Sequence, residues 1–134
     1  MTPTFAELRL LTDDFAASYA FYTEVLGLTP KDEELGREPS TGPYAGFTVG
    51  TADVALFERS LMAGALGVPY AARGTADHAV LVLRVPDVDA AFAEAGDRGA
   101  MPVAAPRDMP AWNLRVAHLR APEGTLIELC QYED

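Results

Sequence analysis

The sequence predicts an α+β fold: two tandem βαβββ modules that form a curved mixed sheet around a cleft. One observation is that alternating apolar and polar residues give way to helical spacing and then return, twice along the chain. A second is that an aspartate suited to cap a helix, Asp14 or Asp87, opens each helical stretch. The third is the length of 134 residues, which suits one domain. We expect a single domain over 1–134, with module 1 at about 5–59, a linker at about 60–76 and module 2 at about 77–133.

The first module begins with a strand-like run at 5–11, in which Glu7 and Arg9 share one face. A helix follows from Asp14, because its carboxylate can accept hydrogen bonds from the first-turn amides. A short strand is expected at 28–32, and a hairpin is expected from strands at 44–49 and 54–59. The buried stripe expected for the helix is Phe15, Tyr19, Tyr22 and Leu26.

The second module repeats this order. The run at 78–85 is almost entirely aliphatic, which predicts a strand covered on both faces. Asp87 then caps a helix, and a short strand follows at 101–105. A closing hairpin is expected from strands at 114–119 and 126–131, because Pro122 and Gly124 in the turn suit a tight reversal.

Charge and composition exclude several functional classes. The net charge is −10, with Lys31 as the only lysine beside nine arginines, which argues against binding to nucleic acid. No apolar run reaches the ~20 residues that cross a bilayer, and no secretory signal opens the chain, so a cytoplasmic location away from membranes is expected. The single cysteine, Cys130, excludes an intrachain disulfide and suits a small buried side chain.

Three motifs resemble those of a known superfamily. The run from Asp14 to Leu28 contains Asp, Phe-Tyr and Leu-Gly at the spacing of an opening signature. The runs 85–91 and 121–129 are similar to the start of a second module and to a closing hairpin, with Ala121 in place of the usual aspartate. Together they resemble the vicinal oxygen chelate superfamily, which contains glyoxalases, extradiol dioxygenases and bleomycin-resistance proteins. The resemblance implies a homodimer and a small-molecule ligand.

The resemblance also implies where a divalent metal ion would bind. Glu7 matches the ligand position of the first strand, and Glu128 matches that of the last strand. Val80 stands at the second-module position and cannot coordinate a metal. His78, two residues earlier on the same strand face, could offer an imidazole in a shifted register, and Glu58 is the candidate for the remaining ligand position on the fourth strand. We therefore expect no metal cofactor, with a divalent metal as the open alternative.

Antibiotic-binding members of the superfamily lack the metal and line their cleft with aromatic and apolar side chains. Trp112, in a loop, offers a rigid surface for stacking on a flat ligand, or plugs the end of the sheet. His118 is either a ligand contact or a hydrogen-bonded sheet residue. The candidate ligand-binding residues are Glu7, Phe47, Phe57, Tyr70, Met109, Trp112, His118 and Glu128, with Met62 as a further candidate.

The expected function is that of a non-metal small-molecule-binding protein that sequesters an antibiotic or aromatic metabolite in self-resistance. The alternative is a metal-dependent lyase, isomerase or dioxygenase that uses Glu7 and Glu128. An accessory protein without a ligand is the third interpretation. No phosphate-binding loop, nucleophile elbow or zinc-binding helix motif is present, and no catalytic residue is assigned.

Overall fold

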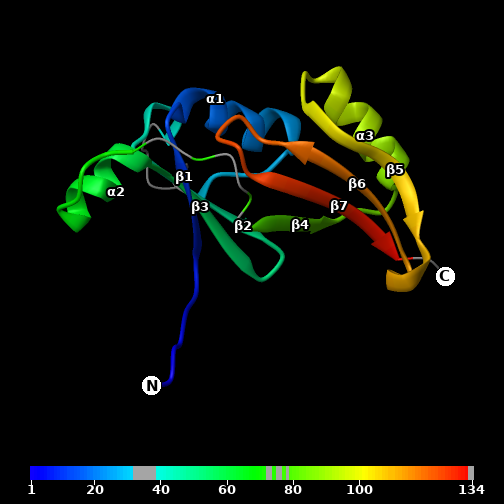
Figure 1. Cartoon of the computed structure of the whole chain (residues 1–134), viewed down its shortest axis with the longest axis horizontal. Helices are drawn as coiled ribbons and strands as arrows, with labels where there is room; N and C mark the ends of the chain where they lie inside the picture. Colours follow the sequence, from blue (N-terminus) through cyan, green and yellow to red (C-terminus); the bar gives the residue numbers. More distant parts are fainter. Residues whose placement is uncertain (32–38, 72–73, 75–76, 78, 133–134) are drawn as a thin grey trace. The chain divides into compact units, whose positions relative to one another are not determined.

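In each half of the chain, a parallel strand pair continues into an antiparallel hairpin to form a mixed sheet (Figure 1). The computed structural model describes residues 1–31, 39–71, 74, 77 and 79–132. The chain divides into unit 1, Met1–Gly74, and unit 2, Thr75–Asp134. Mixed sheets combined with helices confirm the expected α+β class.

Unit 1 contains a three-stranded sheet and two α-helices. In chain order its elements are β1 (Leu8–Thr12), α1 (Phe15–Ala20), a π-helix (Phe21–Val25), a 3₁₀ helix (Pro39–Thr41), β2 (Tyr44–Val49), β3 (Ala52–Glu58) and α2 (Arg59–Leu66). The strand order is β1-β3-β2, with β1 parallel and β2 antiparallel to β3.

The start of α1 is fixed by side-chain hydrogen bonds. Asp14 caps the helix as expected, because its Oδ1 accepts from the backbone N–H of Ala17 at 3.2 Å. A buried hydrogen bond of 2.8 Å joins the hydroxyls of Thr12, at the end of β1, and Ser18, within α1. The strand and the helix that follows it are therefore tied together at their junction.

The core of unit 1 lies between α1 and one face of its sheet. The rings of Tyr22 and Phe47 stack with their centroids 6.1 Å apart, and both side chains are fully buried. Phe21 is also buried, where the helix has changed to π geometry. The helical spacing identified Tyr22 as a core residue but did not include Phe21.

The strand expected at 28–32 is wrong over its described part. Between residues 28 and 31, only Pro30 forms a bridge, to Phe47 of β2. Proline has no backbone N–H, so it cannot donate to a strand ladder. Residue 32 lies outside the described residues.

Unit 2 contains a four-stranded sheet with α3 packed on one face (Figure 1). Its elements are β4 (Val80–Arg84), α3 (Val88–Asp97), β5 (Met101–Met109), a 3₁₀ helix (Pro110–Trp112), β6 (Leu114–Arg120) and β7 (Leu126–Tyr132). The strand order is β4-β7-β6-β5, with β4 parallel to β7 and the other pairs antiparallel. In unit 1, Pro30 forms its bridge to β2 on the edge of the sheet. β5 occupies the equivalent position beside β6 in the sheet of unit 2.

The helix and the closing hairpin of unit 2 follow the sequence closely. Asp87 caps α3 by accepting from the N–H of Ala90 at 3.1 Å. The turn between β6 and β7 closes when the N–H of Gly124 donates to the carbonyl of Ala121 at 2.8 Å. Val88 of α3 and Ile127 of β7 are fully buried in the core of this unit.

β5 is longer than the strand expected at 101–105, because it continues to Met109. It contains Pro102 and Pro106, which made the sequence look like a loop. β5 is an edge strand, and an edge strand tolerates proline because half of its N–H groups need no ladder partner. Its pairing with β6 is shifted twice, between Pro102 and Ala104 and between Ala104 and Arg107.

β4 does not have the cover on both faces that its aliphatic sequence predicted. Val80 and Val82 are 44% and 53% exposed. β4 is the edge strand opposite β5 in its sheet, and only one of its faces is turned toward the helix-covered core.

Among the described residues, no helix is long and apolar enough to cross a membrane.

Candidate functional site

One face of the unit 1 sheet packs on α1, and the other carries Arg9; we call the second the Arg9 face. The register places Leu11 beside Phe57, which pairs in turn with Tyr44. Paired residues project to the same side of a sheet, so these side chains share the Arg9 face. Glu7 directly precedes β1 and lies on the same side as Arg9, as the alternation predicted.

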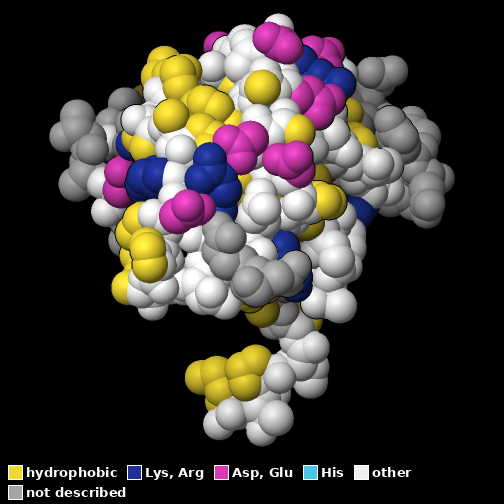
Figure 2. All heavy atoms as spheres, turned by 90° about the vertical axis from the view of Figure 1, so that its right-hand side faces the viewer, with side chains coloured by type: hydrophobic (Ala, Val, Ile, Leu, Met, Phe, Trp, Pro, Cys, Tyr) yellow, Lys and Arg dark blue, Asp and Glu magenta, His cyan; other side chains and the backbone are white. Residues whose placement is uncertain are grey.

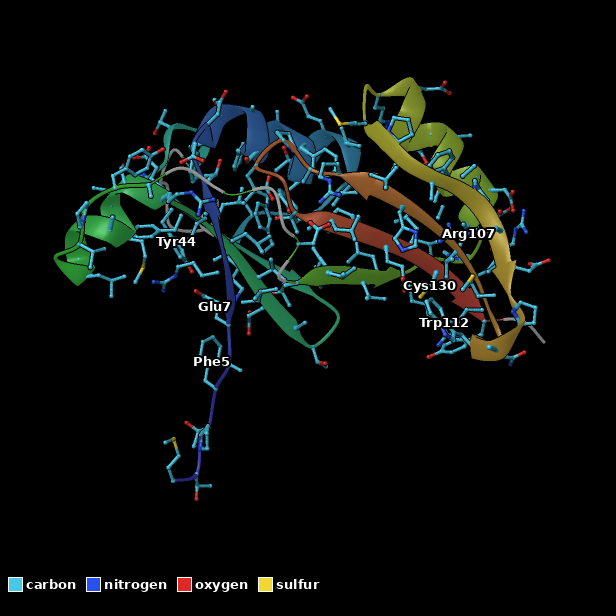
Figure 3. The ribbon with its side chains drawn as sticks, in the orientation of Figure 1. Phe5, Glu7, Tyr44, Arg107, Trp112 and Cys130 are labelled. Carbon is cyan, nitrogen blue, oxygen red and sulfur yellow. The ribbon has the colours of Figure 1, made fainter. Side chains whose placement is uncertain are left out.

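Four side chains of the Arg9 face contact one another, and two of them, Glu7 and Tyr44, are labelled in Figure 3. The hydroxyl of Tyr44 donates to Oε2 of Glu7 at 2.9 Å, and Nη2 of Arg9 lies 3.3 Å from Oε1 of Glu7. The Cζ of Arg9 is 5.9 Å from the ring centroid of Tyr44 and 5.3 Å from that of Phe57. A carboxylate and two aromatic rings thus hold one guanidinium in place.

A hollow of about 490 Å³ opens beside this group of side chains. Phe5, Leu11 and Met62 supply an apolar wall, and Glu7 and Arg9 supply the charged wall. A mostly apolar lining with a few fixed polar groups is typical of small-molecule sites. Of the predicted site residues, Glu7 and Met62 meet here.

In unit 2, one face of the sheet packs on α3, and the other carries His118; we call it the His118 face. One row of paired residues runs across β5, β6, β7 and β4 as Ala104, His118, Glu128 and Val82. The next row is Arg107, Val116, Cys130 and Arg84.

His118 and Glu128, both predicted as site residues, form a hydrogen-bonded pair. Nε2 of His118 lies 3.0 Å from Oε1 of Glu128, and Nδ1 lies 3.4 Å from a guanidinium nitrogen of Arg107. Arginine only donates hydrogen bonds, so Nδ1 accepts and carries no proton. In this arrangement Nε2 of His118 donates to the carboxylate of Glu128.

Arg107 reaches His118 because β5 bulges. Ala104 pairs with His118, and Arg107 pairs with Val116, so three steps along β5 match two along β6. An unbroken strand would turn the residue three positions after Ala104 to the opposite face, and the bulge re-aims it. In Figure 3, Arg107, Cys130 and Trp112 lie toward the same end of the four-stranded sheet.

The described residues do not fit the divalent metal ion that the sequence resemblance implied. No three of their His, Cys, Asp and Glu side chains gather in a group that could hold an ion. The His118 face of β4 presents Val80 and Val82, which have no donor atom. Glu58 pairs with Thr12, on the sheet face opposite Glu7, and His78 lies outside the described residues.

Two predicted site residues of unit 1 lie away from the Arg9 face. Phe47 is fully buried against Tyr19 and Tyr22, so its side chain belongs to the core. Tyr70 is half-exposed and its hydroxyl donates to Asp13, which raises the pKa of the Tyr70 phenol. Phe57 is the aromatic residue of the prediction that does lie on the Arg9 face.

Met109 and Trp112 lie at the far end of the unit 2 sheet. Met109 ends β5 opposite Leu114, and Trp112 belongs to the 3₁₀ helix that connects β5 and β6. The Trp112 side chain is 53% exposed. This exposure favours a stacking surface over a plug on the sheet.

Cys130 lies between Val116 and Arg84 in the second row of the His118 face and is buried. Burial raises the pKa of its thiol, and the charge of Glu128 raises it further. The thiol is therefore a poor nucleophile near neutral pH, in agreement with its interpretation as a small buried side chain.

Sequence reasoning did not single out Tyr44, Arg84 or Arg107 as candidate site residues, and it placed Arg9 only on the same strand face as Glu7. Tyr44 could have been found from the sequence. It is the first residue of a predicted strand, and the alternation of side chains along that strand determines which face of the sheet Tyr44 occupies. Arg107 was not, because its orientation depends on the bulge in β5.

Comparisons with known proteins agree with this geometry. The sequence model of the Glyoxalase/Bleomycin resistance protein/Dioxygenase superfamily matches residues 4–129. The Bacillus subtilis (strain 168) protein YraH is 34% identical over 125 residues, which cover 92% of this chain and 94% of YraH.

Two solved structures illustrate the range of similar proteins. A glyoxalase/bleomycin resistance protein/dioxygenase from Nocardioides has a TM-score of 0.76 and 28% identity, and covers 100% of this chain and 86% of its own. A lactoylglutathione lyase from Agrobacterium tumefaciens has a TM-score of 0.67 and 24% identity, over 97% of this chain and 95% of its own. At that identity, the lyase shares the fold alone.

Proposed function

Because the chain belongs to the Glyoxalase/Bleomycin resistance protein/Dioxygenase superfamily, we propose that it binds a small aromatic molecule and releases it unchanged. The observation that carries the proposal is the hollow of about 490 Å³ on the Arg9 face, with its apolar wall and its fixed guanidinium. A flat ligand can lie against Phe5 and Met62 while its polar groups meet Arg9 or Glu7. The ligand class proposed is an antibiotic or aromatic metabolite, held in sequestration.

Both carboxylates that could serve as metal ligands already accept hydrogen bonds from other side chains of the protein. This supports ligand binding without a resident metal ion. Glu7 accepts hydrogen bonds from Tyr44 and Arg9, and Glu128 accepts one from His118. A metal-dependent lyase, isomerase or dioxygenase would need a further ligand, and the described part of β4 offers Val80 and Val82. We therefore favour binding over metal-dependent chemistry.

A dimer is part of the same proposal. Members of the superfamily often dimerise, and we propose a homodimer as the working form of this chain. Light scattering coupled to size-exclusion chromatography would give the mass of the protein directly. A monomeric mass at the concentration used for the binding experiments would contradict the homodimer and leave the proposed ligand binding unaffected.

Equilibrium dialysis against polycyclic and peptide antibiotics, followed by mass spectrometry of the recovered compound, tests the function. At least one compound should bind and be recovered intact. Met62→Gln should weaken its binding about tenfold, because it places a polar amide in the apolar wall. Leu66→Gln is the matched control on the same helix, because Leu66 is 64% exposed and does not line the hollow.

Recovery of a converted product would overturn the binding proposal in favour of an enzyme. Equal affinities for the two variants would remove the hollow as the binding site. Trp112 is the only tryptophan, so quenching of its fluorescence reports separately on stacking at that residue.

A further inference from the structure

Most arginines of this acidic protein are neutralised by a carboxylate. Seven arginines lie in the described part of the chain, and five of them form an ion pair: Arg9, Arg59, Arg98, Arg115 and Arg120. On the face shown in Figure 2, several Lys and Arg side chains likewise lie directly beside Asp and Glu side chains. Within the described residues, Arg84 and Arg107 are the exceptions, and they lie at the two ends of one row across the unit 2 sheet.

The two exceptions have different surroundings. Arg107 contacts the ring of His118 and the carbonyl of Ala105. Arg84 places its Cζ 4.2 Å from the ring centroid of Tyr132, a cation–π contact. The N–H groups of a guanidinium lie in its plane, so stacking on a ring leaves them free to donate sideways. Among the seven arginines of the described residues, Arg84 is therefore the one whose guanidinium forms neither a hydrogen bond nor an ion pair with another described residue.

Arg84 and Tyr132 line a hollow of about 470 Å³ where β4 and β7 end. Val85 and Pro86 supply its apolar wall, and Gln131 completes the lining. Tyr132 is 56% exposed, so its ring remains accessible beside the guanidinium. The hollow thus joins a positive charge to apolar and aromatic surface.

The amide of Gln131 is used on the α3 side of the sheet. Its side-chain oxygen accepts a hydrogen bond from the backbone N–H of Val88, at the first residue of α3. Gln131 directly precedes Tyr132 on β7, so its side chain projects to the face of the sheet opposite Tyr132 and Arg84. Arg84 is therefore the lining side chain whose N–H groups suit an anion in this hollow.

We propose that this hollow binds the carboxylate of a small planar acid, with the guanidinium of Arg84 as its donor and Tyr132 as its stacking surface. The site goes beyond the proposed function, because none of its five lining residues lines the hollow on the Arg9 face. A guanidinium can hold a carboxylate through two parallel hydrogen bonds, which a neutral or cationic group of the same shape cannot form.

Isothermal titration calorimetry with three matched probes tests the proposal: 2-naphthoate, the neutral 2-naphthylmethanol and the cationic 2-naphthylmethylammonium. Naphthoate should bind at least about tenfold more tightly than either analogue. Arg84→Gln should weaken naphthoate binding about tenfold or more, and Arg84→Lys should restore only part of it, since lysine keeps the charge without the planar fork.

Three variants serve as controls. Arg107→Gln removes the other arginine without a carboxylate partner in the described chain and should leave naphthoate binding unchanged. Arg98→Gln removes an arginine of α3 that pairs with Glu94 and should also be neutral. Met62→Gln, in the hollow of the Arg9 face, should not affect naphthoate. Circular dichroism melts confirm that each variant is folded.

Equal binding of the three probes, no binding of naphthoate, or unchanged binding by Arg84→Gln would overturn the proposal. Weakening by Arg107→Gln or Met62→Gln in place of Arg84→Gln would overturn it as well, because the anion would then bind elsewhere. The proposed function is judged separately, from the antibiotics and the Met62→Gln variant.

Discussion

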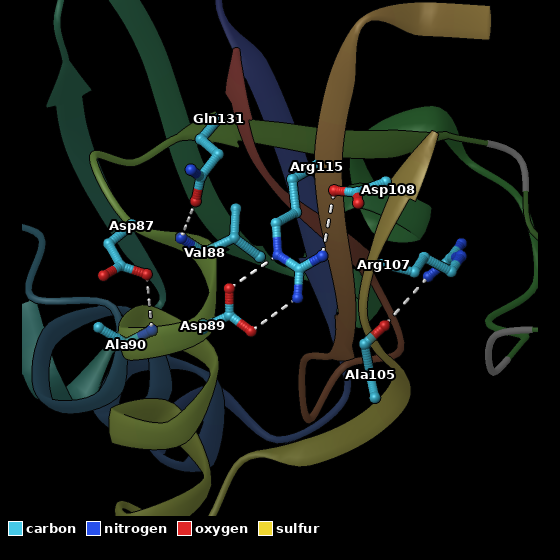
Figure 4. A network of polar contacts seen from close by, with 9 residues as sticks. All are labelled: Asp87, Val88, Asp89, Ala90, Ala105, Arg107, Asp108, Arg115 and Gln131. Carbon is cyan, nitrogen blue, oxygen red and sulfur yellow. Dashed lines mark hydrogen bonds and ion pairs between the residues drawn. The ribbon is translucent and has the colours of Figure 1, made fainter. Parts of the chain in front are cut away.

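The guanidinium of Arg115 donates hydrogen bonds to both carboxylate oxygens of Asp89, with Nε 2.7 Å from Oδ2 and Nη2 2.9 Å from Oδ1 (Figure 4). Asp89 belongs to the first turn of α3 and Arg115 to β6, so the pair fastens the helix to its sheet. A third nitrogen of the same group reaches Asp108 of β5 at 3.1 Å. One arginine therefore joins three elements of unit 2.

Asp89→Asn should lower the midpoint of urea unfolding at pH 7. The hydrogen bonds from Arg115 hold the pKa of the Asp89 carboxyl below its usual range. A carboxyl with a lowered folded pKa stabilises the fold above its unfolded pKa, and this contribution is lost as the pH falls through the folded pKa. The difference between wild type and variant should therefore shrink below about pH 4.

Glu94→Gln is the control for that comparison. Glu94 lies on the same helix and pairs with one exposed arginine, Arg98, so its loss should change the midpoint less. A difference between wild type and Asp89→Asn that stays constant from pH 7 to pH 3 would contradict the electrostatic explanation.

Gly42→Ala should destabilise unit 1. Gly42 has a φ of +73°, and this left-handed backbone conformation costs an alanine about 1–2 kcal/mol relative to its right-handed form. A Cβ there would also lie 3.0 Å from Cγ of Phe15, which is buried. Gly64→Ala is the matched control, since Gly64 lies within α2 with nothing within 4 Å of the added Cβ. It should be neutral or stabilising by up to about 1 kcal/mol. Urea unfolding followed by circular dichroism measures both, and equal stabilities would refute the conformational argument.

Cys130 should react slowly with a thiol reagent such as 5,5′-dithiobis(2-nitrobenzoate) at pH 8. Its thiol is buried, and burial together with Glu128 raises its pKa, so little thiolate is present or accessible. The rate in concentrated urea, where both effects are removed, is the reference. A native rate close to the rate in urea would show that the His118 face opens readily at Cys130.

Removal of divalent ions should leave both the melting temperature and the affinity for any bound antibiotic unchanged. Glu7 and Glu128 already accept hydrogen bonds from protein donors, so they do not need an ion to satisfy them. Differential scanning calorimetry before and after dialysis against a chelator checks the melting temperature. A clear drop that added zinc or manganese reverses would favour the metal-dependent alternative.

Local signals in the sequence predicted the fold well. Asp14 and Asp87 were identified as caps because a capping bond spans only a few residues, and both accept the expected hydrogen bonds. The closing hairpin followed from Pro122 and Gly124 for the same reason. The strand at 28–32 failed because Pro30 cannot donate to a ladder, whatever its neighbours favour.

The candidate site was harder to predict, because it depends on register between distant strands. Glu7 and Glu128 were recognised from motif spacing, but their partners Tyr44 and His118 lie on other strands. Arg107 joins His118 through a bulge that no local pattern marks. Phe47 shows the converse error: its aromatic character suggested a ligand contact, and its face of the sheet placed it in the core.

The prolines of β5 also affect how molecules of this protein meet one another. Pro102 and Pro106 stand on an edge strand, whose outer amides would otherwise offer a template for a strand from a second molecule. Each proline removes one such amide, so no uninterrupted intermolecular ladder can grow along this edge. The residues that concealed β5 in the sequence thereby protect the folded protein from edge-to-edge aggregation in concentrated solution.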